Sequence, residues 1–395
     1  MSFDIALSGI NSVNAQLDTI SNNIANSGTY GFKSSRVNFT STYAGTQSTG
    51  SEVGSLTQSI DAGGSVLTTG RDMDASIQGR GFFASRDSAG NMLYHRVGIF
   101  SKDKDGYIVD SLGRRAQGFA AIPGSTALGP MGDLQVPTGQ IAAQASTQMK
   151  YTGNLSSDWT APAVAVFDPA EPRSFNGSMV SVVYDSLGAQ HSVTQYFVKS
   201  NTNEVTVHYT MDGAAVAGTS VLTFGTDGKL GTPAAPVALA LPTPTGAAPF
   251  AVTMDYAGST SYSGEATTSA NSANGFASGT LIGVQITDDG QVMAKYSNGQ
   301  KQAVGTLALA TFPDEGALVA VSGTSWTTSN ASGTPLYFAP GTGMAGTLTS
   351  GAVEQSNVDI TAELVGLMSA QRNYQANAKV ISTENQMVQA LMQAV

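Results

Sequence analysis

The stretch SNNIANSGTYGFK, from Ser21 to Lys33, ends the first regular pattern of the chain. Up to Ile24 the apolar residues recur at helical spacing, and this spacing then gives way to Asn, Ser and Gly. Lys33 is the first positively charged side chain of the sequence. These residue types are typical of a helix end and the turn after it, and Gly28 is a candidate for the residue just beyond the helix. The sequence therefore predicts an N-terminal helix followed by a turn.

Apolar residues before this turn are spaced alternately by three and four, which is the pattern of a heptad seam. They are Phe3, Ala6, Ile10, Val13, Leu17, Ile20 and Ile24. The C-terminal part repeats the spacing, with two amides on the seam: Ile360, Leu364, Leu367, Gln371, Tyr374, Ala378, Ile381, Asn385, Val388 and Met392. Asp359 is suited to cap the start of this second helix. We expect the two helices to pair as a coiled coil.

Around both seams the helices carry Ser, Ala and amides where coiled coils usually carry Glu and Lys. One interpretation is a single antiparallel pair inside one subunit. The other is a bundle of helices from several subunits, in which every face finds a partner. The neutral side chains favour the bundle, because an isolated helix in water needs charge pairs or an apolar partner. The seam residues are therefore predicted polymer contacts.

Between its ends the chain is predicted to be almost wholly β. Three turns share the pattern Asp-x-x-Gly, at 87–90, 110–113 and 185–188, and join strand-like runs. The predicted fold is mainly β with α-helical termini and with one antiparallel β domain inserted into another. The expected division is a terminal helical domain at 1–30 and 354–395, an extended linker at 31–70, a first β domain at 71–146 and 284–353, and an inserted outer β domain at 147–283.

Composition excludes several classes of function for this chain of 395 residues. The net charge is −10 and only 12% of residues are charged, which argues against nucleic acid and anionic membranes. No cleavable signal or membrane-spanning segment is expected. Without cysteine, disulfides and thiolate metal sites are excluded. The three His are scattered and no catalytic motif occurs, so we expect no enzyme activity, metal or cofactor. A glycan-binding or glycan-cleaving β protein is the alternative from another class.

Four stretches together resemble the bacterial flagellar axial proteins, the family of rod and hook proteins. They are ANSGTYGFK at 25–33, TGRDMDASIQGRGFF at 69–83, YHRVGIFSKDKDGYIVDSLGRRAQGF at 94–119 and GAVEQSNVDITAELVGLMSAQRNYQANAKVISTENQM at 351–387. Rod members share these motifs but are typically shorter and lack so large an insert. The length favours a hook subunit, and a distal rod subunit is the alternative.

The resemblance implies a structural subunit that is exported by the flagellar type III apparatus and polymerises into the hook. This curved tube acts as a universal joint between rod and filament. Implied partners are further copies of the chain, the distal rod, the hook cap, the hook–filament junction protein, the hook-length ruler and the export apparatus. Joints that allow bending are expected at 27–70 and at the domain crossings near 145 and 283. Motif residues implied to act in the joint region or the helices are Asn22, Asn23, Asn26, Gly28, Thr29, Gly31, Phe32, Lys33, Asn357, Asp359 and Arg372.

Overall fold

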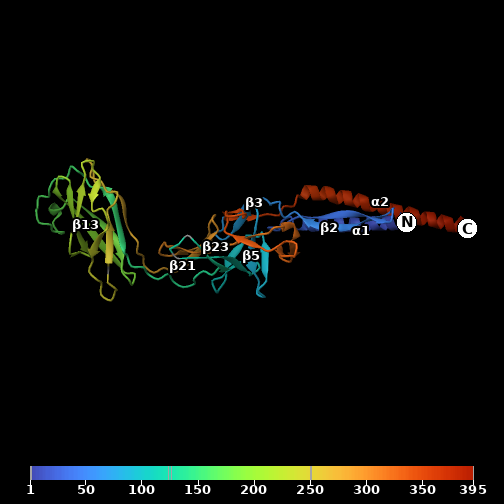
Figure 1. The fold of residues 1–395 in the computed structure, drawn as a ribbon, viewed down its shortest axis with the longest axis horizontal. Coiled ribbons are helices and arrows are strands. Elements are labelled where there is room, and N and C mark those ends of the chain that lie inside the picture. The colour runs from blue at the N-terminus through green and yellow to red at the C-terminus, as the bar shows by residue number, and fades with distance from the viewer. Residues whose placement is uncertain (1, 123, 126, 250, 395) are drawn as a thin grey trace. The chain divides into compact units, whose positions relative to one another are not determined.

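The computed structural model describes residues 2–122, 124–125, 127–249 and 251–394. The chain forms two compact units: Met1–Thr138 with Ile282–Lys295 and Lys301–Val395, and Gly139–Leu281 with Tyr296–Gln300. The fold is mainly β, with one long helix at each end of the chain (Figure 1). This agrees with the predicted fold class. The finer division into four domains remains a prediction.

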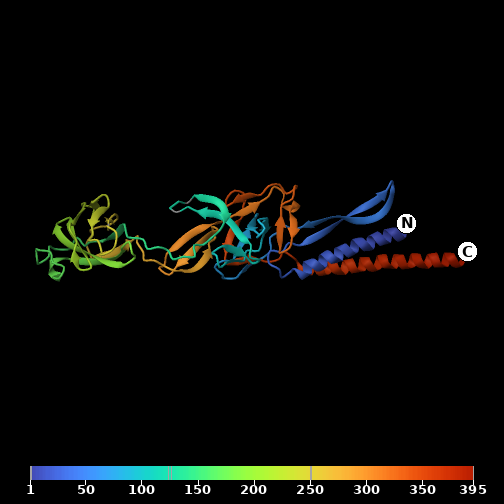
Figure 2. The ribbon, with the colours of Figure 1, turned by 90° about the horizontal axis from the view of Figure 1, so that it is seen from below.

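Helices α1 (Ser2–Ala25) and α2 (Ile360–Ala394) pair antiparallel (Figure 2). Asn23, near the end of α1, contacts Glu363 in the first turn of α2, whereas Gly9 lies against Asn377 farther along. Asp359 caps α2, because its Oδ1 accepts from the backbone N–H groups of residues 361 and 362 at 2.9 and 3.2 Å. Because α2 is the longer helix, its last residues continue past the start of α1.

Residues 35–58 form a long antiparallel hairpin beside α1, made of β1 (Ser35–Ala44) and β2 (Gln47–Gln58) (Figure 2). The region that the sequence analysis treats as an extended linker is therefore largely paired with itself. The hairpin is held to α1 by Ser12, whose Oγ donates to the carbonyl of Ser51 at 3.1 Å. The Ser51 N–H in turn donates to Ser8 Oγ at 3.2 Å. The two strands hold few large apolar residues, and most of these are exposed: Val37, Phe39, Tyr43, Val53 and Leu56. This pattern is too sparse to predict a buried strand face.

The rest of the first unit is built on one large sheet, in which strands far apart in the sequence are neighbours. Its main path runs β21-β22-β23-β9-β5-β6-β26-β25. Two short pairs, β28 with β4 and β29 with β3, complete the unit and bring chain segments before and after the second unit together. The strands are β3 Val66–Thr68, β4 Ala75–Gln78, β5 Phe82–Arg86, β6 Met92–His95, β7 Phe100–Lys102, β8 Ile108–Asp110, β9 Arg115–Ala121, β10 Leu128–Asp133, β21 Leu281–Ile286, β22 Gln291–Tyr296, β23 Lys301–Leu307, β24 Leu309–Thr311, β25 Val319–Val321, β26 Ser325–Thr327, β27 Leu336–Phe338, β28 Thr347–Ser350 and β29 Ala352–Glu354, with a 3₁₀ turn at Glu315–Ala317.

The core of this unit is aromatic. Phe82, Tyr94, Phe312 and Trp326 are all buried, and their rings meet edge-on or tilted at centroid distances of 4.8–6.0 Å. Such offset geometries add to the stabilisation from buried area. These aromatic residues form a closely packed cluster within the first unit.

The second unit is a sandwich of two sheets with the orders β18-β19-β11-β20 and β12-β13-β14-β16-β17. Inward-facing residues of both sheets form a single apolar cluster that includes Tyr151, Val193, Val207 and Met254. The strands are β11 Gln148–Asn154, β12 Gly177–Tyr184, β13 Gln190–Asn201, β14 Glu204–Met211, β15 Ala214–Ala215, β16 Ser220–Phe224, β17 Leu230–Thr232, β18 Val237–Ala240, β19 Ala251–Asp255 and β20 Thr267–Ala273, with a 3₁₀ turn at Pro172–Ser174.

The three Asp-x-x-Gly turns have one common geometry. In each, the Asp Oδ1 accepts from the backbone N–H groups two and four residues later, at 2.8–3.0 Å. The Gly has a φ between 78° and 92°, which an L-residue rarely adopts. The side-chain amide of Asn91, which donates to Asp87 Oδ2 at 3.1 Å, and these backbone N–H groups hold the pKa of Asp87 below its usual value, because they stabilise the ionised carboxylate. The motif found in the sequence thus specifies the turn.

Candidate functional site

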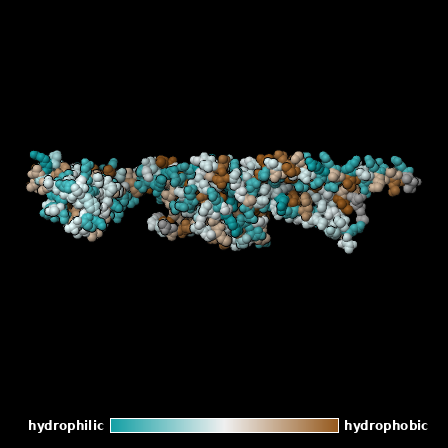
Figure 3. All heavy atoms as spheres, turned by 90° about the horizontal axis from the view of Figure 1, so that it is seen from above, coloured by the Kyte–Doolittle hydropathy of each residue, from teal (hydrophilic) through white to brown (hydrophobic). Residues whose placement is uncertain are grey.

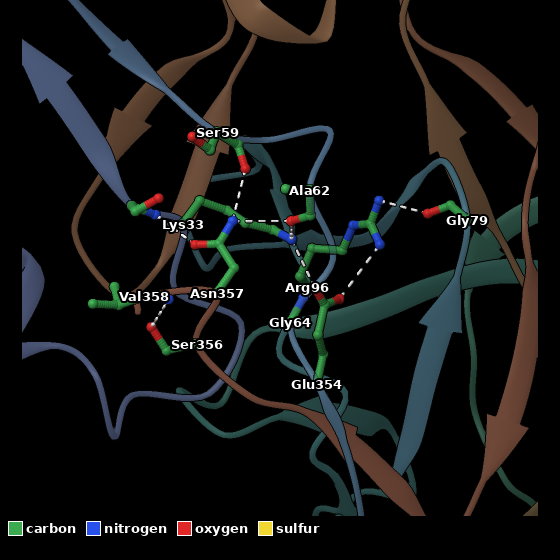
Figure 4. Close-up of polar contacts among 11 residues, drawn as sticks. Lys33, Ser59, Ala62, Gly64, Gly79, Arg96, Glu354, Ser356, Asn357 and Val358 are labelled. Carbon is green, nitrogen blue, oxygen red and sulfur yellow. Dashed lines mark hydrogen bonds and ion pairs between the residues drawn. The ribbon is translucent and has the colours of Figure 1, made fainter. Parts of the chain in front are cut away.

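A buried charged cluster lies where the segment after α1, the segment after β6 and strand β29 meet, and Figure 4 shows its contacts. Its members are Lys33, Arg96 and Glu354, and we call them the charged cluster. Lys33 Nζ donates to Glu354 Oε1 at 2.6 Å, and Arg96 Nη1 donates to Glu354 Oε2 at 3.4 Å. The three side chains are 0%, 4% and 2% exposed, respectively. Two cations thus share one carboxylate away from solvent.

The remaining bonds of the charged cluster reach the backbone of three further positions (Figure 4). Lys33 Nζ also donates to the Ala62 carbonyl at 2.7 Å, and Arg96 Nη2 donates to the Gly79 carbonyl at 2.8 Å. The Gly64 N–H donates to Glu354 Oε1 at 3.0 Å. Burial lowers the pKa of Lys33, and the adjacent Glu354 carboxylate opposes this shift. The carboxylate therefore compensates a charge that burial disfavours.

Two amides, Asn23 and Asn357, lie between the charged cluster and the helices. The cluster and these amides together are called the junction. Asn23 is 1% exposed; its Oδ1 accepts from the Ser35 N–H at 2.9 Å, and its Nδ2 donates to Glu363 Oε1 at 2.8 Å. Asn357 Oδ1 accepts from the Ser34 N–H at 2.8 Å. Its Nδ2 donates to the carbonyls of residues 59 and 62 at 2.9 and 3.0 Å. Each amide thus replaces a missing backbone partner where a strand or helix ends.

Gly31, not Gly28, is the residue that the turn requires to be glycine. Its φ is +67°, and a Cβ would lie 2.9 Å from backbone atoms of Arg96 and Val97. The Gly31 N–H donates to the Glu354 carbonyl at 2.8 Å. Gly28 does not have a positive φ, and a Cβ there would meet nothing within 4 Å. Because α1 ends at Ala25, the expectation that Gly28 is the residue just beyond the helix is wrong.

Most of the other motif residues lie in the turn after α1 or next to it. Asn26 Nδ2 donates to Asn22 Oδ1 at 2.8 Å, and Thr29 Oγ1 donates to Asn26 Oδ1 at 3.1 Å, so these three brace the turn after α1. The half-buried Phe32 contributes its carbonyl to the Asn357 N–H at 3.3 Å. Arg372 is exposed on α2, apart from the junction. Arg96, Glu354 and Glu363 were not among the predicted site residues; for Glu354, its place at the end of the apolar run Ala352–Glu354 was the available signal.

The seam predicted on α1 faces α2 for much of its length. Ala6, Val13 and Ile20 are buried, Ile10, Leu17 and Ile24 are half-buried, and Phe3 is 41% exposed. Val13 and Ile20 pack against Ala370 of α2 with support from Leu367.

On α2 the predicted seam does not form the centre of this contact. Small and polar positions face α1 instead: Gly366 beside Ile20, the fully buried Ala370, and Asn377 beside Gly9. Of the predicted seam, Leu367, Ala378 and Ile381 are half-buried, and the exposed members are Ile360, Leu364, Gln371, Tyr374, Asn385, Val388 and Met392. Small residues allow close helix approach, which a search for large apolar residues overlooks.

A wide part of the α2 surface is therefore apolar and unpartnered in the single chain. Exposed apolar residues are Ile360, Leu364, Val365, Met368, Tyr374, Val380, Met387, Val388, Leu391 and Met392. In Figure 3, which shows one face, brown residues occur among the teal and white ones along the helical end of the molecule. Residues 385–394 carry no charge. Exposed apolar surface of this extent marks an interaction site.

A Ser-His-Asp group in the first unit is not a catalytic arrangement. Ser85 Oγ lies 2.9 Å from His95 Nε2, but Asp110 Oδ2 approaches the same nitrogen, at 3.5 Å. In a catalytic triad the acid orients the opposite ring nitrogen. All three side chains are buried, and burial lowers the pKa of His95 to about 4. His95 is thus a neutral core residue. In the described part of the chain, no cluster of three potential His or carboxylate metal ligands occurs.

Models of known protein families match both helices and stretches of both units. A model of the flagella basal body rod protein matches residues 3–33, and one of the flagellar hook protein FlgE/F/G D1 domain matches 76–156. The flagellar basal body protein FlaE D2 domain matches 154–276, and the C-terminal model of the flagellar basal body rod FlgEFG proteins matches 349–394. The flagellar hook protein FlgE of Escherichia coli (strain K12) is 36% identical, over 99% of both chains.

The chain belongs to the flagellar hook protein family. It is a structural subunit of the bacterial flagellar hook, and the flagellum is its location. Salmonella typhimurium (strain LT2) has a hook protein FlgE with the same 36% identity and 99% coverage of both chains. The crystal structure of flagellar hook protein FlgE2 from Helicobacter pylori has a similar fold, with a TM-score of 0.54 at 14% identity, over 73% of this chain and 99% of that one. None of the helices described here is long and apolar enough to cross a membrane.

Proposed function

We propose that this hook subunit polymerises into a curved, flexible tube that works as a universal joint between rod and filament, and that copies of the chain meet through the exposed face of α2. The observation that carries the proposal is the unpartnered apolar surface of α2, above all on residues 385–394. Val388, Leu391 and Met392 are 51%, 68% and 76% exposed. A helix with so much exposed apolar surface gains stability when neighbouring helices cover it.

The seam residues on both helices, including the exposed Phe3 and the amides Gln371 and Asn385, belong to this proposed contact. Polar residues at such positions specify register and the number of partners at some cost in stability. By membership in the family, we propose the distal rod, the hook cap, the hook–filament junction protein, the hook-length ruler and the type III export apparatus as further partners. We propose no catalytic activity, nucleic acid or membrane partner.

The experiment compares two double variants of the full chain with matched chemistry. Val388→Gln with Leu391→Gln changes the proposed contact, and Val166→Gln with Leu187→Gln changes residues of the second unit that are 78% and 66% exposed. Both should fold as the wild type does. Since each buried side chain contributes about 1.5–3 kcal/mol, the first pair should raise the critical concentration for assembly about a hundredfold or more.

Light scattering and electron microscopy of assembling protein measure this concentration. The control pair should assemble as the wild type does. Equal assembly of the two double variants would show that the face of α2 is not the polymer contact.

A further inference from the structure

The residues on either side of the hairpin are tied to β29 by buried bonds to Glu354. We infer that the charged cluster makes residues 31–34 and 59–64, on either side of the hairpin, a rigid connection that fixes the direction of α1 and α2 relative to the strands of the first unit, so that Lys33, Arg96 and Glu354 are positioning residues of the hook subunit. This replaces the expectation of a flexible joint at 27–70. The inference rests on the proposed function in one respect: in a tube that bends, some connections within the subunit move and others stay rigid.

Three chain segments meet on the carboxylate of Glu354. Glu354 lies in β29, which pairs with β3 and ends shortly before α2. Its side chain receives Lys33, which follows α1, Gly64, which follows the hairpin, and Arg96, which follows β6. Its carbonyl receives the Gly31 N–H. The start of α2 and the end of α1 are therefore held by the same residue.

Separating the buried charges of the charged cluster is electrostatically unfavourable. All three charged side chains are at least nine-tenths buried, and Glu354 is the carboxylate that both cations contact. A rotation that separates Lys33 from Glu354 leaves a buried charge without its partner, which is strongly unfavourable. Buried ion pairs add little net stability over apolar residues of similar size, but they favour one arrangement over its alternatives. The cluster thus resists displacement more than it strengthens the fold.

The backbone packs closely around the charged cluster. Gly31 approaches Arg96 and Val97 so closely that a Cβ would lie 2.9 Å from their backbone atoms. Asn357 adds a second set of bonds to the same turn, from its side chain to Ser34 and from its N–H to Phe32. A hinge needs loosely packed residues whose φ and ψ are free to change. This segment has the opposite character.

Hydrogen exchange on the full-length monomer tests the inference without any substitution. The Gly31 and Gly64 N–H groups donate to Glu354, whereas Gly45 and Thr46 form the hairpin turn. We expect the first two to exchange at least about a hundredfold more slowly than the turn, because they open only when the cluster opens. Exchange of Gly31 and Gly64 at the rate of the turn would overturn the inference, whether or not the protein polymerises.

A matched pair of variants then assigns the rigidity to the charge. Glu354→Gln removes the carboxylate that Lys33 and Arg96 contact, and the control Glu171→Gln removes the charge from a surface pair with Arg173. We expect exchange at Gly31 to accelerate about a hundredfold in the first variant and to stay unchanged in the second. Unchanged exchange at Gly31 in Glu354→Gln would refute the positioning role. If this variant does not fold, the wild-type comparison still decides.

Discussion

Replacing Gly31 with alanine is a direct test of the turn after α1. Two independent penalties arise from the structure. The φ of +67° places an L-residue in the left-handed region, which costs about 1–2 kcal/mol. The new Cβ would also lie 2.9 Å from backbone atoms of Arg96 and Val97, and forced overpacking costs about 1–3 kcal/mol. We therefore expect Gly31→Ala to lower the free energy of unfolding of the first unit by about 2–5 kcal/mol.

Gly28→Ala is the matched control three residues earlier in the same turn. Gly28 is exposed, has no positive φ, and leaves open space where a Cβ would be. Alanine there reduces the conformational entropy of the unfolded chain, so we expect a change between zero and a stabilisation of about 1 kcal/mol. The comparison therefore separates the geometry of position 31 from a general effect of losing glycine.

Tryptophan fluorescence during urea unfolding is a suitable assay. The chain has two Trp; Trp326 is buried in the first unit and Trp159 lies in the second. In a Trp159→Phe background, Trp326 alone reports on the unit that contains the turn. If Gly31→Ala and Gly28→Ala unfold at the same urea concentration with the same slope, the argument for a required left-handed glycine is refuted.

Two further predictions concern the core and the helix pair. Because burial lowers the pKa of His95 to about 4 while the unfolded chain titrates near 6.5, stability should fall as the pH drops through this window, by up to about 3 kcal/mol. His95→Gln should flatten the dependence of unfolding free energy on pH there; an unchanged slope would contradict it. Ala370→Leu should cost about 1–3 kcal/mol, measured by denaturation of the helix pair, because Ala370 is fully buried against Val13 and Ile20, whereas the exposed Ala376→Leu should be neutral.

The helices and the Asp-x-x-Gly turns were predictable because their signals are local. The spacing of apolar residues ends at Ile24, and α1 ends at the following residue. Asp359 precedes α2 and caps it. At Asp87 the side chain and the Gly three residues later together specify the turn geometry. Each of these features depends on side chains within a few residues of one another.

The partner face of α2 and the charged cluster were not predictable in this way. Facing α1 requires small residues such as Gly366 and Ala370, which do not stand out in a hydrophobic pattern. Lys33 stood out as the first positive charge, but its partner is 321 residues away in the sequence. Glu354 ends a short apolar run, but no local pattern indicates that its partner is Lys33. The hairpin at 35–58 escaped notice because neither of its faces is a continuous apolar surface.

The sequence distance between Lys33 and Glu354 also imposes an order in time. A chain that emerges from a ribosome or a narrow channel with its N-terminus first presents Lys33 early, but the carboxylate arrives only after the strands of both units. Until then Lys33 keeps its hydration, and α1 has no α2 to cover Val13 and Ile20. Closure of so long a loop gains nothing until its final contacts form. The charged cluster and the α1–α2 pair are therefore the last parts to form. In each copy they stay unformed until synthesis or passage is nearly complete.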